Sequence, residues 1–301
     1  MGRAFHTIAF VLLLLFVQSC DDDKTDYKPK YSESSATKKR TLVFGVHPLH
    51  NPTLLLRRYG PIIDYLNQNF DDVQFRLEAS RNYEEYDKKL ADRVFEFALP
   101  NPYQTVTARK YGYHVFGKMG DDQDFRGIIL VRRDGPIQNL EDLKGKRISY
   151  PAKTALAATM MPQFFLFTHG INVNSDVENL CVGSQESSIM NVYLGNVSAG
   201  ATWPIPWNAF IKEHPEQAAE LEVKWQTDSL INNSLVARDD MPPDLVEKVA
   251  TLLVTLKDTD SGRAMLDRLP ISEFDRANDA QYDVIQSFLT AYSKSILPVW
   301  P

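Results

Sequence analysis

The ten residues VGSQESSIMN, 182–191, contain the junction that decides the fold class of this chain. An apolar run, 180–182, ends at Gly183, small hydroxyl side chains follow, and apolar positions at helical spacing come next. A short apolar strand that leads directly into a helix is the repeating unit of an α/β protein. The junction itself is open to three interpretations: a nucleophile turn, a helix cap or a cradle for an anion.

The same strand-then-helix unit recurs along the chain. Pro102 occupies the first helical position after one such strand, as is typical of a helix start. Two series of these units predict two lobes, each a mostly parallel sheet flanked by helices, with a ligand cleft where the strands end. The expected strands are 42–47, 73–79, 95–100, 126–133, 148–150, 197–202 and 233–238.

Composition narrows the functional class. The chain has 301 residues, of which 44% are hydrophobic and 24% charged, and its formal net charge is -6. That charge argues against general nucleic-acid binding, which needs a basic surface. Only two cysteines are present, Cys20 and Cys181, so neither a disulfide framework nor a cysteine-based zinc cluster is expected. Cys181, within an apolar strand, is expected to be a buried thiol.

The N-terminus has the features of a processed leader. Residues 8–17 form an apolar run that is too short to span a bilayer, and Ser19-Cys20 follows it in a pattern that resembles a bacterial lipobox. We expect a signal peptide over 1–19, lipidation of Cys20 and a polar tether over 20–40. The mature protein would then be anchored on the periplasmic side of the inner membrane. An ordinary secretory signal is the alternative.

Catalytic and metal chemistry lack the residues they need. Gly-Ser-Gln-Glu-Ser is not a G-x-S-x-G elbow, no histidine pairs convincingly with a serine, and no phosphate-binding glycine loop occurs. His47 and His50 form an H-x-x-H pattern without a third ligand nearby. We therefore expect a binding protein with no catalytic residue, no metal and no cofactor.

A helix start favours the binding of an anion. Ser184, Gln185, Glu186 and Ser187 fall on the predicted helix N-terminus, where free N–H groups and the helix dipole attract negative charge. Plain capping by Ser184 is the alternative. The carboxylate of Glu186 would repel a simple anion, unless the ligand also carries a cation.

Several blocks of sequence look familiar together. TLVFGVHP, FEFALPNPY, FRGIILVRRDGPIQNLEDLKGKRISY and GSQESSIMNVYLGNVSAGA resemble the phosphonate/phosphite-binding proteins of ABC importers, in the right order over roughly 41–290. The resemblance implies a two-lobed type II periplasmic-binding-protein fold, with lobe 1 at 41–127 and 235–301 and lobe 2 at 128–234. The strands near 126–133 and 233–238 would be the hinges.

The resemblance also implies a ligand and a partner. The ligand would be a small oxyanion such as a phosphonate, phosphite or phosphate, and the partner an ABC permease. The alternative is the same fold serving a membrane sensor kinase or cyclase. In the family a Ser-Thr-Ser-Gly turn wraps the anion, but here 151–159 keeps only Thr154, followed by Ala155. Gln185 replaces a histidine of the family, and Ser198 replaces an aspartate. The resemblance is therefore a safer guide to the fold of this chain than to its ligand.

Other strand ends supply further candidates. His47 ends the first strand and is expected to be a donor that faces the cleft. Asn51 and Asn101 stand at helix starts, where each could contact the ligand or only cap its helix. Trp203 could line the pocket or pack in the core. Asn101 and Tyr103 fall on positions that line the cleft in the family. The expected ligand-binding set is His47, Asn51, Asn101, Tyr103, Thr154, Ala155, Ser184, Gln185, Glu186, Ser187 and Trp203.

Overall fold

The computed structural model describes residues 39–269 and 271–296. The predicted signal peptide, tether and lipidation site at Cys20 lie outside this part of the chain. Within it, no helix is both long and apolar enough to cross a membrane.

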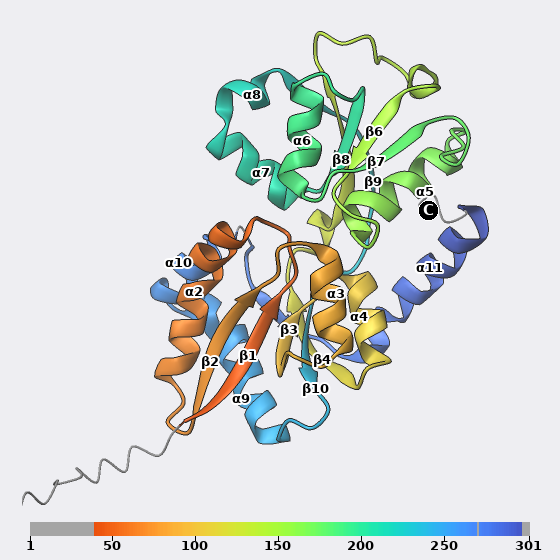
Figure 1. Ribbon diagram of the computed structural model, residues 1–301. Helices are drawn as coiled ribbons and strands as arrows, with labels where there is room; N and C mark the ends of the chain where they lie inside the picture. The colour runs from red at the N-terminus through yellow and green to blue at the C-terminus, as the bar shows by residue number, and fades with distance from the viewer. Residues whose placement is uncertain (1–38, 270, 297–301) are drawn as a thin grey trace, which may run out of the picture. The chain divides into compact units, whose positions relative to one another are not determined.

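One six-stranded sheet holds the N-terminal strands, in the order β11-β4-β10-β3-β1-β2. It is covered by helices whose apolar faces pack on it; α2, for example, buries Leu55, Ile62 and Leu66. Its strands are β1 (Arg40–Val46), β2 (Val73–Ala79), β3 (Phe97–Leu99), β4 (Tyr113–Met119), β10 (Ser234–Arg238) and β11 (Phe274–Arg276). Its helices are α2 (Pro52–Gln68), α3 (Tyr83–Ala91), α4 (Pro102–Arg109), α9 (Pro243–Val254) and α10 (Asp260–Leu266) (Figure 1).

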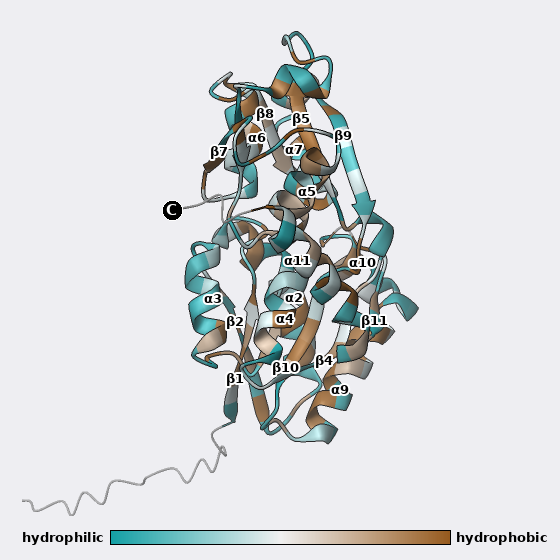
Figure 2. Cartoon of the chain, turned by 90° about the vertical axis from the view of Figure 1, so that its right-hand side faces the viewer, coloured by the Kyte–Doolittle hydropathy of each residue, from teal (hydrophilic) through white to brown (hydrophobic). Residues whose placement is uncertain are grey.

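A second, five-stranded sheet follows the order β7-β6-β8-β5-β9. Its strands are β5 (Arg126–Arg132), β6 (Arg147–Tyr150), β7 (Glu178–Cys181), β8 (Ala199–Thr202) and β9 (Leu221–Ser229). Figure 2 shows the interior strand β5 as hydrophobic and the neighbouring edge strand β9 as more hydrophilic, in line with their burial. A π-turn η3 (Leu156–Met160) continues into α5 (Met161–Thr168), and α6 (Gln185–Tyr193), α7 (Pro204–Glu213) and α8 (Pro215–Ala219) complete this half. Short 3-10 turns are η1 (Asp122–Asp124), η2 (Leu140–Leu143), η4 (Thr255–Asp258) and η5 (Asp279–Tyr282).

Strand pairing is mixed, which corrects the expectation of mostly parallel sheets. Parallel pairs β1–β2, β1–β3, β6–β7 and β6–β8 form one side of each sheet. The antiparallel pairs involve β5, which enters the second sheet from the first, and β10, which returns. A strand that arrives from the other sheet runs away from the junction, whereas the parallel strands run toward it. Its pairing is therefore antiparallel. The edge strand β11 also pairs antiparallel with β4.

Two short segments, 120–125 and 230–233, carry the chain between the sheets. The expected hinge strands 126–133 and 233–238 lie almost wholly within the sheets, because their backbone groups are used in pairing. The C-terminal helix α11 (Asp283–Ser295) touches both halves: Arg109 of α4 pairs with Asp283, and the Tyr292 hydroxyl donates to Gln163 of α5.

Cys181 is exposed, which corrects the expectation of a buried thiol. It ends β7, the edge strand of the second sheet, and a strand with a neighbour on one side only leaves part of its surface to solvent.

Candidate functional site

A small pocket, with an empty volume of about 200 Å³, lies where strand ends of the two sheets meet. Five residues of the expected set line it: His47, Asn101, Ala155, Gln185 and Trp203. Six further residues complete the wall: Tyr83, Phe125, Leu156, Ala157, Ala158 and Asn233. The lining therefore combines elements of both halves of the fold.

The start of the η3–α5 helix forms one wall of this pocket. Ala155 is its N-cap residue and has no side-chain hydrogen bond to the first turn. The first N–H groups of a helix have no partner within the helix, and an alanine cap offers none. Ala155, Leu156, Ala157 and Ala158 are all at most 4% exposed, so these donors lie in a dry surrounding at the pocket. Such a site suits an anion.

His47 contributes a neutral imidazole. It is 2% exposed, and its Nδ1 lies 2.9 Å from the Leu99 carbonyl oxygen. Burial lowers the pKa of His47 to about 4, because the charged imidazolium is poorly solvated there. The neutral ring donates from Nδ1 to the carbonyl and keeps Nε2 as an acceptor. The expectation that His47 is a donor to the ligand therefore does not match the geometry.

Two amide side chains are held in place by hydrogen bonds at both ends. Asn101 donates from Nδ2 to the Thr154 carbonyl (2.8 Å) and accepts at Oδ1 from the Gln104 N–H (3.0 Å). Gln185 donates from Nε2 to the Tyr83 hydroxyl (3.2 Å) and accepts at Oε1 from Thr202 (2.8 Å). The Asn101 and Gln185 bonds to Thr154 and Tyr83 link the two halves. Since the Tyr83 oxygen accepts, its own O–H remains a donor at the pocket.

Trp203 fills both roles that were open for it. Its ring packs edge-on against Phe125, with centroids 5.5 Å apart, and the side chain is 2% exposed. It also lines the pocket. A buried indole of this kind packs as core and keeps its N–H as a donor.

The pocket contains no charged side chain. Its lining includes no Lys, Arg, Asp or Glu, and its one histidine is neutral. Neutral donors and helix N–H groups thus provide the attraction for an anion.

Three members of the expected set line a neighbouring groove instead. Asn51, Ser184 and Glu186 line a groove of about 370 Å³ beside α7, which Gln185 also reaches. Asn51 caps α2 by accepting from the Leu54 N–H (2.9 Å), and Glu186 lies 3.6 Å from His214. The carboxylate of Glu186 is therefore outside the wall of the small pocket.

At the start of α6 the two serines bond each other. The Ser184 Oγ accepts from the Ser187 N–H (3.0 Å) and donates to the Ser187 Oγ (2.8 Å). This is the capping arrangement. Ser187 lines neither the small pocket nor the groove beside α7.

Thr154 and Tyr103 also lie away from the small pocket. Thr154 donates from Oγ1 to Asp87 (2.9 Å) and lines a wider opening of about 1000 Å³. Burial raises the pKa of Asp87, while its bonds from Gln104 and Thr154 oppose that rise. Tyr103 is half-buried against the core of the first sheet.

The pocket residues that were not predicted carry only weak signals in the sequence. Leu156, Ala157 and Ala158 act through their backbone, and an alanine-rich helix start does not look like a binding motif. Tyr83 follows a capping asparagine and Asn233 sits between two strands, where either could be structural. In the described part of the chain, no group of three His, Cys, Asp or Glu side chains is placed to hold a metal ion.

Comparison with known proteins agrees with this architecture. The family described as "ABC transporter, phosphonate, periplasmic substrate-binding protein" matches residues 44–282. A phosphate-import protein from Mycolicibacterium smegmatis is 22% identical over 268 residues, covering 83% of this chain and 82% of the relative. Among solved structures, PhnD1 from Prochlorococcus marinus in complex with methylphosphonate has a TM-score of 0.77 at 21% identity. It covers 85% of this chain and 99% of that one.

A second solved structure gives the same result. The binding protein component of an ABC phosphonate transporter from Pseudomonas aeruginosa has a TM-score of 0.79 at 15% identity, with coverage of 85% and 88%. These likenesses confirm the type II periplasmic-binding-protein fold, and the family consists of binding proteins rather than enzymes. The chain belongs to the family of periplasmic phosphonate-binding proteins that serve ABC transporters.

Proposed function

We propose that this protein captures a phosphonate-, phosphite- or phosphate-like oxyanion in the small pocket and delivers it to the permease of an ABC importer. The observation that carries the proposal is the uncapped η3–α5 helix start, whose buried residues 155–158 line the pocket. Hydrogen bonds from such N–H groups to an anion are stronger than those between neutral groups.

The side chains around this helix start support a small, compact ligand. The Tyr83 hydroxyl and the Trp203 indole add donors, while Asn101 and Gln185 bridge the two halves beside them. A compact lining drawn from both halves suits a tetrahedral oxyanion with a short substituent better than a sugar or a peptide. Without a carboxylate in the lining, an aminophosphonate has no anionic partner for its amine there.

A thermal-shift screen of the soluble domain from residue 39 tests the proposal. We expect methylphosphonate, phosphite or phosphate to raise the melting temperature, since a ligand at a hundred times its Kd stabilises the folded state by about 2.7 kcal/mol. Amino derivatives and amino acids should give smaller shifts. If no oxyanion shifts the transition while an unrelated solute does, the proposed ligand class is wrong.

The lipid anchor at Cys20 is part of the same proposal. The apolar run 8–17 and Ser19-Cys20 motivate it. Replacing Cys20 with Ala in the full chain should move the protein from the membrane fraction to the soluble fraction or block its processing. Unchanged membrane association of that variant would leave an ordinary secretory signal, or another anchor, as the better account.

A further inference from the structure

Asn233 lines the pocket and carries a buried, unpaired acceptor. The residue lies in the crossing segment 230–233 and is fully buried. Its Nδ2 donates to the Met119 sulfur (3.4 Å), whereas its Oδ1 has no hydrogen-bond partner among the described residues. Turning the amide over would set the lone pairs of Oδ1 against those of the sulfur, so the observed orientation is the favourable one.

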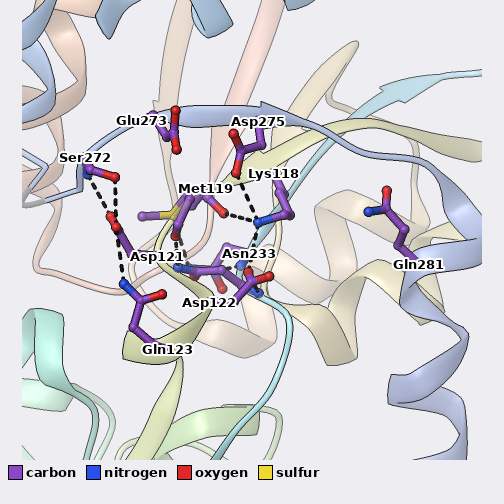
Figure 3. A network of polar contacts seen from close by, with 12 residues as sticks. Lys118, Met119, Asp121, Asp122, Gln123, Asn233, Ser272, Glu273, Asp275 and Gln281 are labelled. Carbon is purple, nitrogen blue, oxygen red and sulfur yellow. Dashed lines mark hydrogen bonds and ion pairs between the residues drawn. The ribbon is translucent and has the colours of Figure 1, made fainter.

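Hydrogen bonds also fix the backbone at Asn233. Its N–H donates to Asn232 Oδ1 (2.8 Å), and the Asn232 N–H donates to Asp122 Oδ1 (2.9 Å). Lys118 donates to the same Asp122 oxygen (2.9 Å), which ties both crossing segments to the first sheet (Figure 3). The backbone that carries the acceptor is therefore held by a network of hydrogen bonds.

A buried acceptor without a partner is unfavourable, because it has lost its bonds to water. A ligand that brings a donor would restore the missing bond. The neutral His47 offers a second acceptor at Nε2 in the same lining. The pocket thus presents donors from the helix start and acceptors from Asn233 and His47.

These two kinds of group distinguish between oxyanions. A fully ionised oxyanion has only acceptor oxygens, and one of them would face the Asn233 oxygen. A monoanionic phosphonate, phosphite or phosphate carries at least one P–O–H donor as well as acceptors. It also carries a single negative charge, which costs less to transfer into a lining without cations than two charges do.

We propose that the pocket selects an oxyanion that retains a hydroxyl hydrogen, and that Asn233 is the residue that determines this selection by accepting that hydrogen. The inference rests on the proposed function and names the protonation form of its ligand. A sulfonate, which has the same shape and a single charge but no hydroxyl, is the class of anion that the pocket should reject.

Calorimetry with a matched pair of ligands tests the inference. Methylphosphonate and methanesulfonate are compared at a slightly acidic pH, where each carries one negative charge. The wild-type domain should bind methylphosphonate about tenfold to a hundredfold more tightly, the usual range for one hydrogen bond that involves a charged group. In Asn233→Leu, the affinity for methylphosphonate should fall while the affinity for methanesulfonate does not. The two affinities should then lie within about threefold of each other.

Asn232→Leu is the control variant. Asn232 donates to the Gly120 carbonyl and accepts from Asn233, so its loss should disturb the crossing segments and weaken both ligands by the same factor. The ratio of affinities, not either affinity alone, reports on Asn233.

Each outcome decides between the two proposals. Equal binding of the two ligands by the wild type, or an unchanged ratio in Asn233→Leu, overturns the inference and leaves the proposed function in place. If Asn233→Leu does not fold, the wild-type ratio still decides. If the wild type binds neither ligand nor any oxyanion of the thermal-shift screen, the proposed function fails and this inference fails with it.

Discussion

Two helices of the second half begin at candidate anion sites, and sequence and structure disagree on which of the two helix starts is the better site. The α6 start, 184–187, is rich in hydroxyls, while the η3–α5 start, 155–158, is nearly all alanine. In the structure Ser184 caps the first of these, and nothing caps the second. A capping hydroxyl satisfies a helix N–H and so takes one donor away from a ligand. The plainer sequence therefore makes the better anion site.

Burial strengthens this contrast. The residues at 155–158 are almost inaccessible, whereas Ser184, Glu186 and Ser187 are only partly buried or exposed. N–H groups without a partner in a dry surrounding reduce the stability of the free protein and are satisfied when an anion binds. Binding and stability should thus be coupled at the η3–α5 start and nearly independent at α6.

The largest effect on affinity should come from adding a cap at the η3–α5 start. In Ala155→Asp the new carboxylate would accept from the first-turn N–H groups and repel an anion at close range, so oxyanion affinity should fall by more than about a hundredfold. Ser184→Asp, which exchanges one cap for another at α6, is the matched control and should change affinity far less. Calorimetry on both variants checks this. Comparable losses in the two would remove the distinction between the helix starts.

The dry surrounding of the pocket predicts a pH dependence of stability. The pKa of His47 is about 4 in the folded protein, below its usual 6.5. As the pH falls below about 6.5 the unfolded chain takes up the proton first, so stability is lost between pH 6.5 and 4, by about 3 kcal/mol in all. Urea unfolding across this range measures the loss.

Two variants identify the source of that pH dependence. His47→Asn should flatten the pH profile. His50, whose pKa is also lowered mainly by burial, should leave a residual slope that His50→Gln removes. A profile in His47→Asn as steep as in the wild type would mean that the imidazole is solvated and the pocket wet.

A medium effect should follow from loss of the tyrosine hydroxyl beside the pocket. Tyr83→Phe removes both the acceptor for Gln185 and a donor to the ligand, so affinity should fall about tenfold. Tyr86→Phe is the control, because the Tyr86 hydroxyl is buried without a hydrogen-bond partner among the described residues and Tyr86 does not line the pocket. Equal affinities for the two variants, measured by calorimetry, would contradict a ligand contact by Tyr83.

The smallest effect on affinity should come from removing the cap of α6. Ser184→Ala should lower the free energy of unfolding by about 1 kcal/mol, the usual value of such a cap, while oxyanion affinity stays within about twofold. Chemical denaturation and calorimetry measure the two quantities. If Ser184→Ala and Ser187→Ala each weakened binding tenfold or more without loss of stability, α6 would be the cradle after all.

Much of the fold could be predicted from local pattern. Apolar runs of strand length followed by caps such as Asn51 and Asn101 located the strands and helix starts, because these signals depend on neighbours within a few residues. Strand direction could not be predicted in the same way. Whether a strand pairs parallel or antiparallel depends on which sheet it enters and from which side, and this is a property of the whole chain path.

The sequence by itself determined the alternation of strands and helices, the family resemblance and the absence of a catalytic motif. The tertiary structure alone decided which helix start is buried and uncapped, that Glu186 lies in a neighbouring groove, and that Asn233 meets the pocket with a free acceptor. A side chain shows its donors and acceptors in the sequence. Whether each donor or acceptor is already paired depends on groups far away in the chain, as with Gln185 and Tyr83. Only folding brings those groups together.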